Sequence, residues 1–250
     1  MKKILLAGIL VASSLMALTN LEIAKKADKA TDGFESSISK TEMILINANG
    51  QKSVRELLMK TLEKADGDKT ISTFLSPADV KGTKILTWEH IDRDDDQWLY
   101  LPALKRVKRI ASRNKSGSFM GSEFSYEDIG NQNYKKYTFK GEPQKVMLDS
   151  IECYKGVRIP KAQNSGYTKQ VTWVDTKDFL IRKIDYYDRK KELLKTAIFS
   201  DYKKIDGIWR MGKIKMINHQ NDKSTILIWK EDKIKAGLTD KDFDKRMLKR

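Results

Sequence analysis

Alternating apolar and polar residues dominate the second half of the chain and predict a series of β-strands. The segments with this pattern are 134–140, 145–154, 168–175, 180–187, 193–203, 212–218 and 224–231. Short polar turns such as Gly141-Glu142 and Asp206-Gly207 separate them. Strands at roughly ten-residue spacing with tight turns are typical of an antiparallel meander. The pattern therefore predicts a mainly β protein.

The first half of the chain has similar strand patterns, preceded by one helix. Apolar residues recur at helical spacing in 22–31, and Asp32-Gly33 ends that helix. Apolar runs at 43–46 and 53–59 flank an Asn-Gly turn, which predicts a hairpin. Further strands are expected at 69–75, 83–91 and 98–101, whereas 112–123 is a loop rich in Ser and Gly. A short helical turn or an edge strand is expected at 239–248.

Several predicted strands are apolar on both faces, as in 43–46 and 225–229. A strand with one face in water alternates, so both faces of these strands are expected to be covered. A helix could cover one face, or the sheet could curl around a cavity lined by aliphatic and aromatic groups. Both alternatives predict a sheet wrapped into a half-barrel or barrel.

Alternation along the strands selects nine candidates for the lining of such a cavity, although the same side chains could fill an ordinary core. They are Met43, Leu45, Trp98, Tyr100, Trp173, Ile214, Met216, Ile226 and Ile228. Phe119 and Met120, in the Gly/Ser loop, are candidates for a lid at the cavity mouth, or they could tuck under the sheet.

The first residues have the pattern of a secretory signal. Lys2 and Lys3 precede an uncharged, mainly apolar run over 4–18, which is too short to span a bilayer at about 20 residues. We expect residues 1–19 to be a cleavable signal, cut after Ala17 or near Asn20, and 20–250 to be one domain in the periplasm. The alternative is an uncleaved anchor. No cysteine lies near the cut, so attachment of a lipid to a new N-terminal cysteine is excluded.

Composition and charge narrow the class of partner. Hydrophobic residues make up 40% of the 250 residues and charged residues 33%, which is typical of a globular protein. The net charge is +15, which favours anionic lipid, nucleic acid or an acidic protein patch as a partner, or simply aids solubility. Export argues against nucleic acid.

No catalytic or metal-binding motif is found in the sequence. The histidines, His90 and His219, have no ligand-spaced neighbours, and the acidic run 92–96 lacks the Gly and the distal Glu of a calcium loop. The glycine loop 117–122 lacks the Lys-Ser/Thr of a phosphate-binding loop, and the lone Cys153 is expected to be a buried core thiol. The sequence therefore predicts no enzyme, no cofactor and no metal.

Two consecutive segments carry a resemblance to a known family. The block 95–110 reads Asp-Asp-Gln-Trp-Leu-Tyr-Leu-Pro-Ala-Leu-Lys-Arg-Val-Lys-Arg-Ile, and 114–128 follows it with Asn-Lys-Ser-Gly-Ser-Phe-Met-Gly-Ser-Glu-Phe-Ser-Tyr-Glu-Asp. Together they closely resemble the signature of the outer-membrane lipoprotein-sorting proteins, larger relatives of the periplasmic carrier LolA. Segments 172–175, 186–188, 194–196 and 243–250 support the match, and Glu123 stands where aspartate is expected.

The resemblance implies both a fold and a function. The fold is LolA/LolB-like: a curved antiparallel sheet forming an incomplete barrel, with helices plugging its concave side. The function is binding of lipoprotein or lipid acyl chains for transfer towards the outer membrane. Partners would be those chains and an exporter of the resistance-nodulation-division type or an outer-membrane acceptor, and the protein would act as a monomer. The alternatives are an accessory subunit that docks on such an exporter without shuttling, and a structural envelope protein with a filled core.

Basic residues follow Pro102 in the first signature block, at Lys105, Arg106, Lys108 and Arg109. We expect some of them to bind lipid phosphate or an acidic patch on an exporter or acceptor, because guanidinium groups pair bidentately with phosphate. The alternative is that they pair with the acidic run 92–96 across a hairpin.

Overall fold

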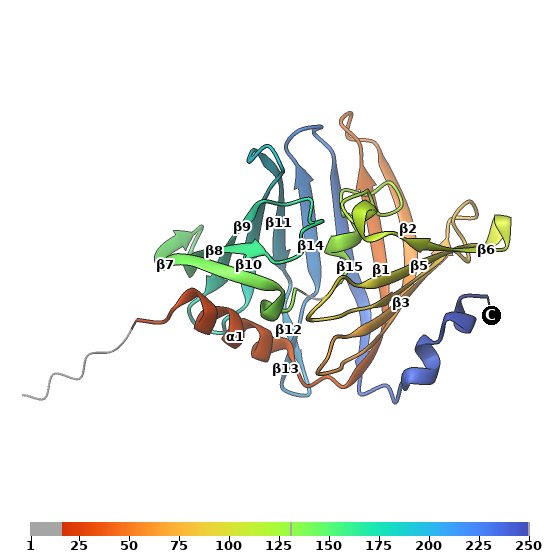
Figure 1. Ribbon diagram of the computed structural model, residues 1–250, viewed down its shortest axis with the longest axis horizontal. Coiled ribbons are helices and arrows are strands. Elements are labelled where there is room, and N and C mark those ends of the chain that lie inside the picture. The colour runs from red at the N-terminus through yellow and green to blue at the C-terminus, as the bar shows by residue number, and fades with distance from the viewer. Residues whose placement is uncertain (1–16, 131, 250) are drawn as a thin grey trace, which may run out of the picture.

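A computed structural model describes residues 17–130 and 132–249. Most of the predicted signal segment, residues 1–16, lies outside this described part. One antiparallel sheet of thirteen strands forms the body of the protein, in the order β6-β5-β4-β3-β2-β1-β15-β14-β11-β10-β9-β8-β7. It curves without closing, since β6 and β7 are its two unpaired edges (Figure 1). The predicted fold class, an incomplete antiparallel barrel, is confirmed.

The strands of this sheet run over the following residues. They are β1 (Ser36–Ile46), β2 (Lys52–Leu62), β3 (Lys69–Ser76), β4 (Lys84–Trp88), β5 (Asp96–Leu101), β6 (Arg106–Ile110), β7 (Tyr137–Leu148), β8 (Ile151–Pro160), β9 (Lys169–Asp175), β10 (Ile181–Tyr187), β11 (Leu193–Ser200), β14 (Lys213–Asn218) and β15 (Ser224–Ile234). A separate small hairpin consists of β12 (Lys203–Ile205) and β13 (Ile208–Arg210). The β1–β2 hairpin turns at the predicted Asn-Gly.

Helix α1 (Asn20–Thr31) lies against the β7–β9 end of the sheet. Thr19 and Glu22 form a capping box that fixes its start, and Ile23 and Ala27 pack against Val174 of β9. The side chain of Asn20 is buried and donates hydrogen bonds to the carbonyl oxygens of residues 140 and 141 at 3.1 and 2.8 Å. These two bonds hold the first turn of α1 on the sheet.

The concave face of the sheet is covered by the connection between β6 and β7, residues 111–136, which we call the plug (Figure 1). It contains the 3₁₀ helices η2 (Ser112–Asn114), η3 (Tyr126–Asp128) and η4 (Tyr134–Lys136). Its Phe119 and Phe124 enter the largest core cluster, together with Met43 of β1 and Ile85 of β4. The second signature segment, 114–128, therefore forms most of the plug.

The C-terminal segment covers the opposite, convex face. The 3₁₀ helices η5 (Asp240–Phe243) and η6 (Lys245–Lys249) carry Phe243 and Leu248, which are fully buried against Leu86 of β4 and Trp98 of β5. Adjacent residues of β4 point to opposite faces of the sheet. Ile85 belongs to the core cluster on the concave face, and Leu86 belongs to the cluster under the C-terminal segment. The sheet is thus covered on both faces near β3–β5, by the plug inside and the C-terminal segment outside.

Candidate functional site

A mainly apolar cavity of about 290 Å³ lies on the concave side, between the sheet, the plug and the β12–β13 hairpin. Its wall also includes ionisable side chains, which are Asp32, Asp68, Glu89, Asp128, Arg210 and Asp232. Its lining is rich in aromatic and methionine side chains, which are Phe34, Met59, Phe124, Tyr186, Phe199, Tyr202, Trp209, Met211, Met216 and Trp229. Methionine is flexible and adapts to ligands of varied shape. The volume is near the lower end of the roughly 300–1,000 Å³ of small-molecule pockets, so the cavity can take one apolar chain rather than several.

Four of the nine predicted lining residues face this concave side. Ile214 and Met216 of β14 line the cavity directly. Met43 is fully buried in the surrounding core cluster, and Leu45 packs against it. For these four residues, a role in lipid binding stays a prediction.

The other five candidates face the convex side, so the prediction that they line the hollow is wrong for them. Trp98 packs with Tyr100 beneath the C-terminal segment. Trp173 lies on the face of β9 opposite α1, and the ammonium groups of Lys155 and Lys183 lie 5.3 and 4.2 Å from its ring centroid.

The prediction is also wrong for Ile226 and Ile228, because the residues of β15 that face the hollow are one position further along the chain. Leu227 belongs to the concave core and Trp229 packs against it, so the alternate residues point outward. Both sets of alternating residues are apolar, and the sequence therefore does not say which set points into the hollow.

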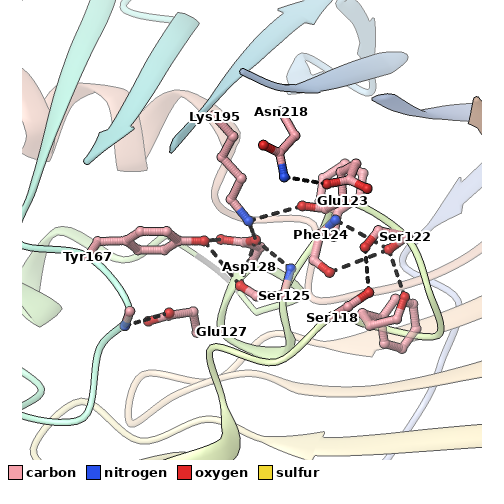
Figure 2. A network of polar contacts seen from close by, with 12 residues as sticks. Ser118, Ser122, Glu123, Phe124, Ser125, Glu127, Asp128, Tyr167, Lys195 and Asn218 are labelled. Atoms are coloured by element: carbon pink, nitrogen blue, oxygen red, sulfur yellow. Dashed lines mark hydrogen bonds and ion pairs between the residues drawn. The ribbon is translucent and has the colours of Figure 1, made fainter. Parts of the chain in front are cut away.

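A buried polar network holds the plug to the sheet (Figure 2). The Lys195 ammonium on β11 lies 2.6 Å from the Asp128 carboxylate on η3, and their side chains are only 4% and 3% exposed. Lys195 also donates to the backbone carbonyl of Glu123 at 3.0 Å. The hydroxyl groups of Tyr167 and Ser125 donate to the same carboxylate at 2.8 and 2.7 Å. The backbone amide of Ser125 donates to it as well, at 2.6 Å, so Asp128 is satisfied by one cation, two hydroxyl groups and one amide.

The tyrosine in this network stays in its neutral, hydrogen-bond-donating form. Burial is the largest effect on Tyr167 and raises the pKa of its hydroxyl well above the ordinary value, and the negative charge of Asp128 raises it further. Burial likewise raises the pKa of Glu127, which accepts hydrogen bonds from Ser165 Oγ and the Gly166 amide. The network therefore joins the plug to the loop before β9 as well as to β11.

Four further contacts fix the tip of the plug. Asn218 of β14 donates to the Glu123 carboxylate at 2.6 Å, and the Glu123 amide donates to Thr225 Oγ1 of β15 at 3.0 Å. Phe119 is 1% exposed, in ring contact with Phe74 at 5.9 Å, and the carbonyl oxygen of Met120 accepts a hydrogen bond from Arg55. The prediction of Phe119 as a lid at the mouth is therefore wrong: its ring tucks under the sheet, and only Met120 keeps partial exposure.

A second, larger cavity of about 670 Å³ adjoins the first and has a polar lining. Its walls are the loop 91–95 before β5, the plug and the loop 160–170 between β8 and β9. Asp128 and Gln132 line both cavities, so they form the boundary between the two. Together the cavities give the hollow an apolar end and a polar end.

The predicted basic stretch lies on the edge strand β6 and just before it. Arg109 forms an ion pair with Asp96, as the hairpin alternative requires, and Arg93 and His90 contact the same carboxylate at 3.0 and 3.1 Å. Burial opposes ionisation of Asp96, but the hydrogen bonds from these three residues lower its pKa to about 2. Lys105, Arg106 and Lys108 are exposed.

Metal-binding groups, free thiols and membrane-spanning helices are the remaining features of interest in the described residues. Within residues 17–130 and 132–249, no group of three or more His, Cys, Asp or Glu side chains could hold a metal ion. Cys153 is a fully buried free thiol, as the sequence predicts. No helix of the described chain has the length and apolarity that a membrane span requires.

Comparison with solved structures identifies the family. An outer membrane lipoprotein-sorting protein domain from Vibrio parahaemolyticus is 46% identical, with a TM-score of 0.88 over 92% of this chain and 98% of that one. The chain belongs to the outer membrane lipoprotein-sorting protein family. A DUF1329 family protein from Desulfovibrio piger is 33% identical over 91% of this chain and 97% of that one, with a TM-score of 0.86.

More distant comparisons agree with the LolA-like fold. A LolA superfamily protein from Nitrosomonas europaea, 21% identical, shares the fold with a TM-score of 0.75 over 92% of this chain and all of that one. A family model described as "-like: Uncharacterized protein" matches residues 66–250. None of the curated proteins matches the chain. The LolA-like lipoprotein-sorting fold is not that of a known enzyme family.

Sequence reasoning missed the residues that anchor the plug. Asp128 ends the second signature segment and Lys195 lies in the supporting segment 194–196, but neither was assigned a role. A lysine between Leu194 and the apolar end of β11 was the available signal, because a buried lysine requires a paired carboxylate. Nothing in the sequence placed that carboxylate in the loop 67 residues away.

Proposed function

We propose that this LolA-like protein binds the acyl chain of a lipoprotein or lipid in its concave apolar cavity and carries it through the periplasm towards the outer membrane. The observation that supports this most directly is the cavity of about 290 Å³ lined by Ile214, Met216 and Trp229 inside an unclosed sheet. Burying a chain contributes about 0.8 kcal/mol per CH₂, so an apolar surface alone gives useful affinity. No catalytic group is needed.

Export by a cleavable signal is part of the proposal, and the structure favours one of the two predicted cuts. A cut after Ala17 leaves Thr19, the cap of α1, and Asn20, which holds α1 on β7. A cut after Asn20 would remove both. We expect sequencing of the mature N-terminus from a periplasmic fraction to begin at Leu18.

Docking on a donor or acceptor is proposed for the edge strand β6. Lys105, Arg106 and Lys108 are exposed next to the unpaired edge of the sheet, where an acidic patch on an exporter or outer-membrane acceptor could contact them. Arg109 already pairs with Asp96, so we propose the other three residues as the main docking cations. We propose that the protein acts as a monomer.

A cavity-filling variant tests the acyl-chain site. Ile214→Trp places an indole inside the cavity, and we expect it to lower affinity for a fluorescent fatty acid at least about tenfold. Its matched control is Ile226→Trp, the same change on the convex face of the neighbouring strand. Fluorescence titration of both variants, with circular dichroism to verify folding, measures the difference. Equal binding by Ile214→Trp and the parent protein would contradict the proposal.

A further inference from the structure

Lysine and apolar residues alternate in a row across the convex face of the sheet. The row crosses five neighbouring strands, with each residue directly opposite the next: Lys155 of β8, Trp173 of β9, Lys183 of β10, Ile198 of β11 and Lys215 of β14. Opposite residues of antiparallel strands point to the same face. Ala197, next to Ile198, lies in the concave core, which places the row on the other side. We call these five residues the convex row.

The convex row lies away from the segment that covers the convex face elsewhere. The C-terminal segment packs near β3–β5, at the opposite end of the sheet from β8–β10 (Figure 1). Ile198 is 41% exposed and belongs to none of the hydrophobic core clusters of the described residues. The ammonium groups of Lys155 and Lys183 lie over the Trp173 ring, and lysine can extend its charged end while its stem stays on an apolar surface. The row therefore offers apolar surface and cations together.

Most lysines on this part of the convex face have no partner carboxylate. Within the described chain, no carboxylate oxygen lies within 4.0 Å of the ammonium groups of Lys155, Lys169, Lys213 and Lys215. The carboxylates of Asp175 and Asp185 lie on the same face, but each is already paired with a cation, at 2.8 and 3.1 Å. The surface around the row is therefore positively charged, as is the whole chain at +15.

An anionic bilayer matches both features of the convex row. Lysines near the surface of such a bilayer are attracted to its negative potential, and tryptophan is favoured at the boundary between headgroups and acyl chains. Ile198, between Lys183 and Lys215, adds apolar surface at the same level. A second copy of this chain fits less well, because two such faces would bring lysines against lysines.

We propose that the convex row is a membrane-contact surface that holds the protein on an anionic phospholipid bilayer. This inference goes beyond the proposed function and is independent of the apolar cavity, which lies on the concave side. Docked through its convex face, the protein would keep the plug and the cavity turned towards the periplasm.

Sedimentation with sucrose-loaded vesicles tests the inference with two charge-matched double variants. Ile198→Glu with Lys215→Glu alters the convex row. Leu21→Glu with Lys25→Glu makes the same change of charge on the solvent face of α1, where Leu21 is 40% exposed, against 41% for Ile198. We expect the parent protein and the α1 variant to bind phosphatidylglycerol vesicles at least about tenfold more tightly than phosphatidylcholine vesicles. The convex-row variant should lose this preference, with circular dichroism verifying that it is folded.

The possible outcomes decide between a specific surface and the net charge of the chain. Equal losses in the two double variants would show that net charge alone attracts the protein to vesicles, and would overturn the inference. It would also be overturned if the parent protein bound both kinds of vesicle equally, bound neither, or kept its preference in the convex-row variant.

Discussion

The Lys195–Asp128 ion pair connects the plug to the sheet through two almost completely buried charges. Desolvating two charges is costly, and such pairs contribute net stability only when hydrogen bonds satisfy their remaining atoms. Here Tyr167 and Ser125 donate to Asp128, and the Glu123 carbonyl accepts from Lys195. Removal of one partner therefore leaves a buried group that keeps its hydrogen bonds but has lost its countercharge.

Lys195→Met should lower the free energy of unfolding by about 3–5 kcal/mol, because the buried Asp128 side chain would lose its only cation partner in the described chain. Chemical denaturation at neutral pH measures this change. Lys40→Met is the control, since the Lys40–Glu231 pair is 57% and 67% exposed and should contribute less than about 1 kcal/mol. Similar losses in the two variants would show that the buried pair has no special role.

The sequence predicts where a side chain lies when its residue type is expected in only one place, such as the core. Cys153 illustrates this, because a lone cysteine in a predicted strand is expected in the core and is fully buried. The prediction fails for Ile226 and Ile228, because Leu227 and Trp229 between and after them are equally apolar. Which set faces the hollow is decided by the packing of the plug and of the C-terminal segment on opposite faces of the sheet, which local pattern does not encode.

At the scale of elements, α1 depends on a close approach to β8. A Cβ at Gly156 would lie 2.1 Å from Asn20 Oδ1, so only glycine allows the Asn20 side chain to reach the carbonyls of residues 140 and 141 in β7. We expect Gly156→Ala to lower the free energy of unfolding by about 1–3 kcal/mol. Thermal denaturation measures it, and combining the change with Asn20→Ala should recover part of the loss by removing the clash. If Gly156→Ala were as stable as the parent protein, the close contact between Gly156 and Asn20 would be contradicted.

The last turns of α1 give the protein a pH-dependent stability. Burial, together with the nearby carboxylate of Asp68, raises the pKa of Asp28 to about 6. In the unfolded chain the Asp28 carboxyl group ionises near pH 4. Between about pH 4 and 6 the folded protein therefore binds more protons than the unfolded chain, and its free energy of unfolding falls as pH rises. Asp28→Asn should remove this loss and stabilise the protein by on the order of 1 kcal/mol at pH 8, allowing for partial exposure.

Denaturation of the parent protein and Asp28→Asn at pH 4 and pH 8 checks this prediction. The two proteins should have nearly the same free energy of unfolding at pH 4, and Asp28→Asn should be the more stable at pH 8. A difference of the same size at both pH values would assign it to packing rather than to the charge.

Most elements could be predicted from the sequence, since strand alternation and turn residues are local. The β1–β2 hairpin and the helix before Asp32-Gly33 form as their patterns indicate. The plug could not be placed, because its Ser- and Gly-rich sequence has no period and its position depends on contacts with β11, β14 and β15 far along the chain.

At the scale of the whole molecule, the hollow of the sheet is largely filled by the protein itself. The plug and α1 occupy the concave side, and what remains is a small apolar cavity beside a larger polar one. A cargo with several acyl chains would need the plug to move, whereas a single chain fits the structure as it stands. Shape thus favours a single-chain amphiphile.

Native mass spectrometry of the protein from a periplasmic extract shows whether the concave cavity carries a lipid in the cell. We expect a population with the added mass of one amphiphile, present in the parent protein and in Ile226→Trp but lost in Ile214→Trp. Parent protein that is free of any bound amphiphile in the native extract would contradict this expectation.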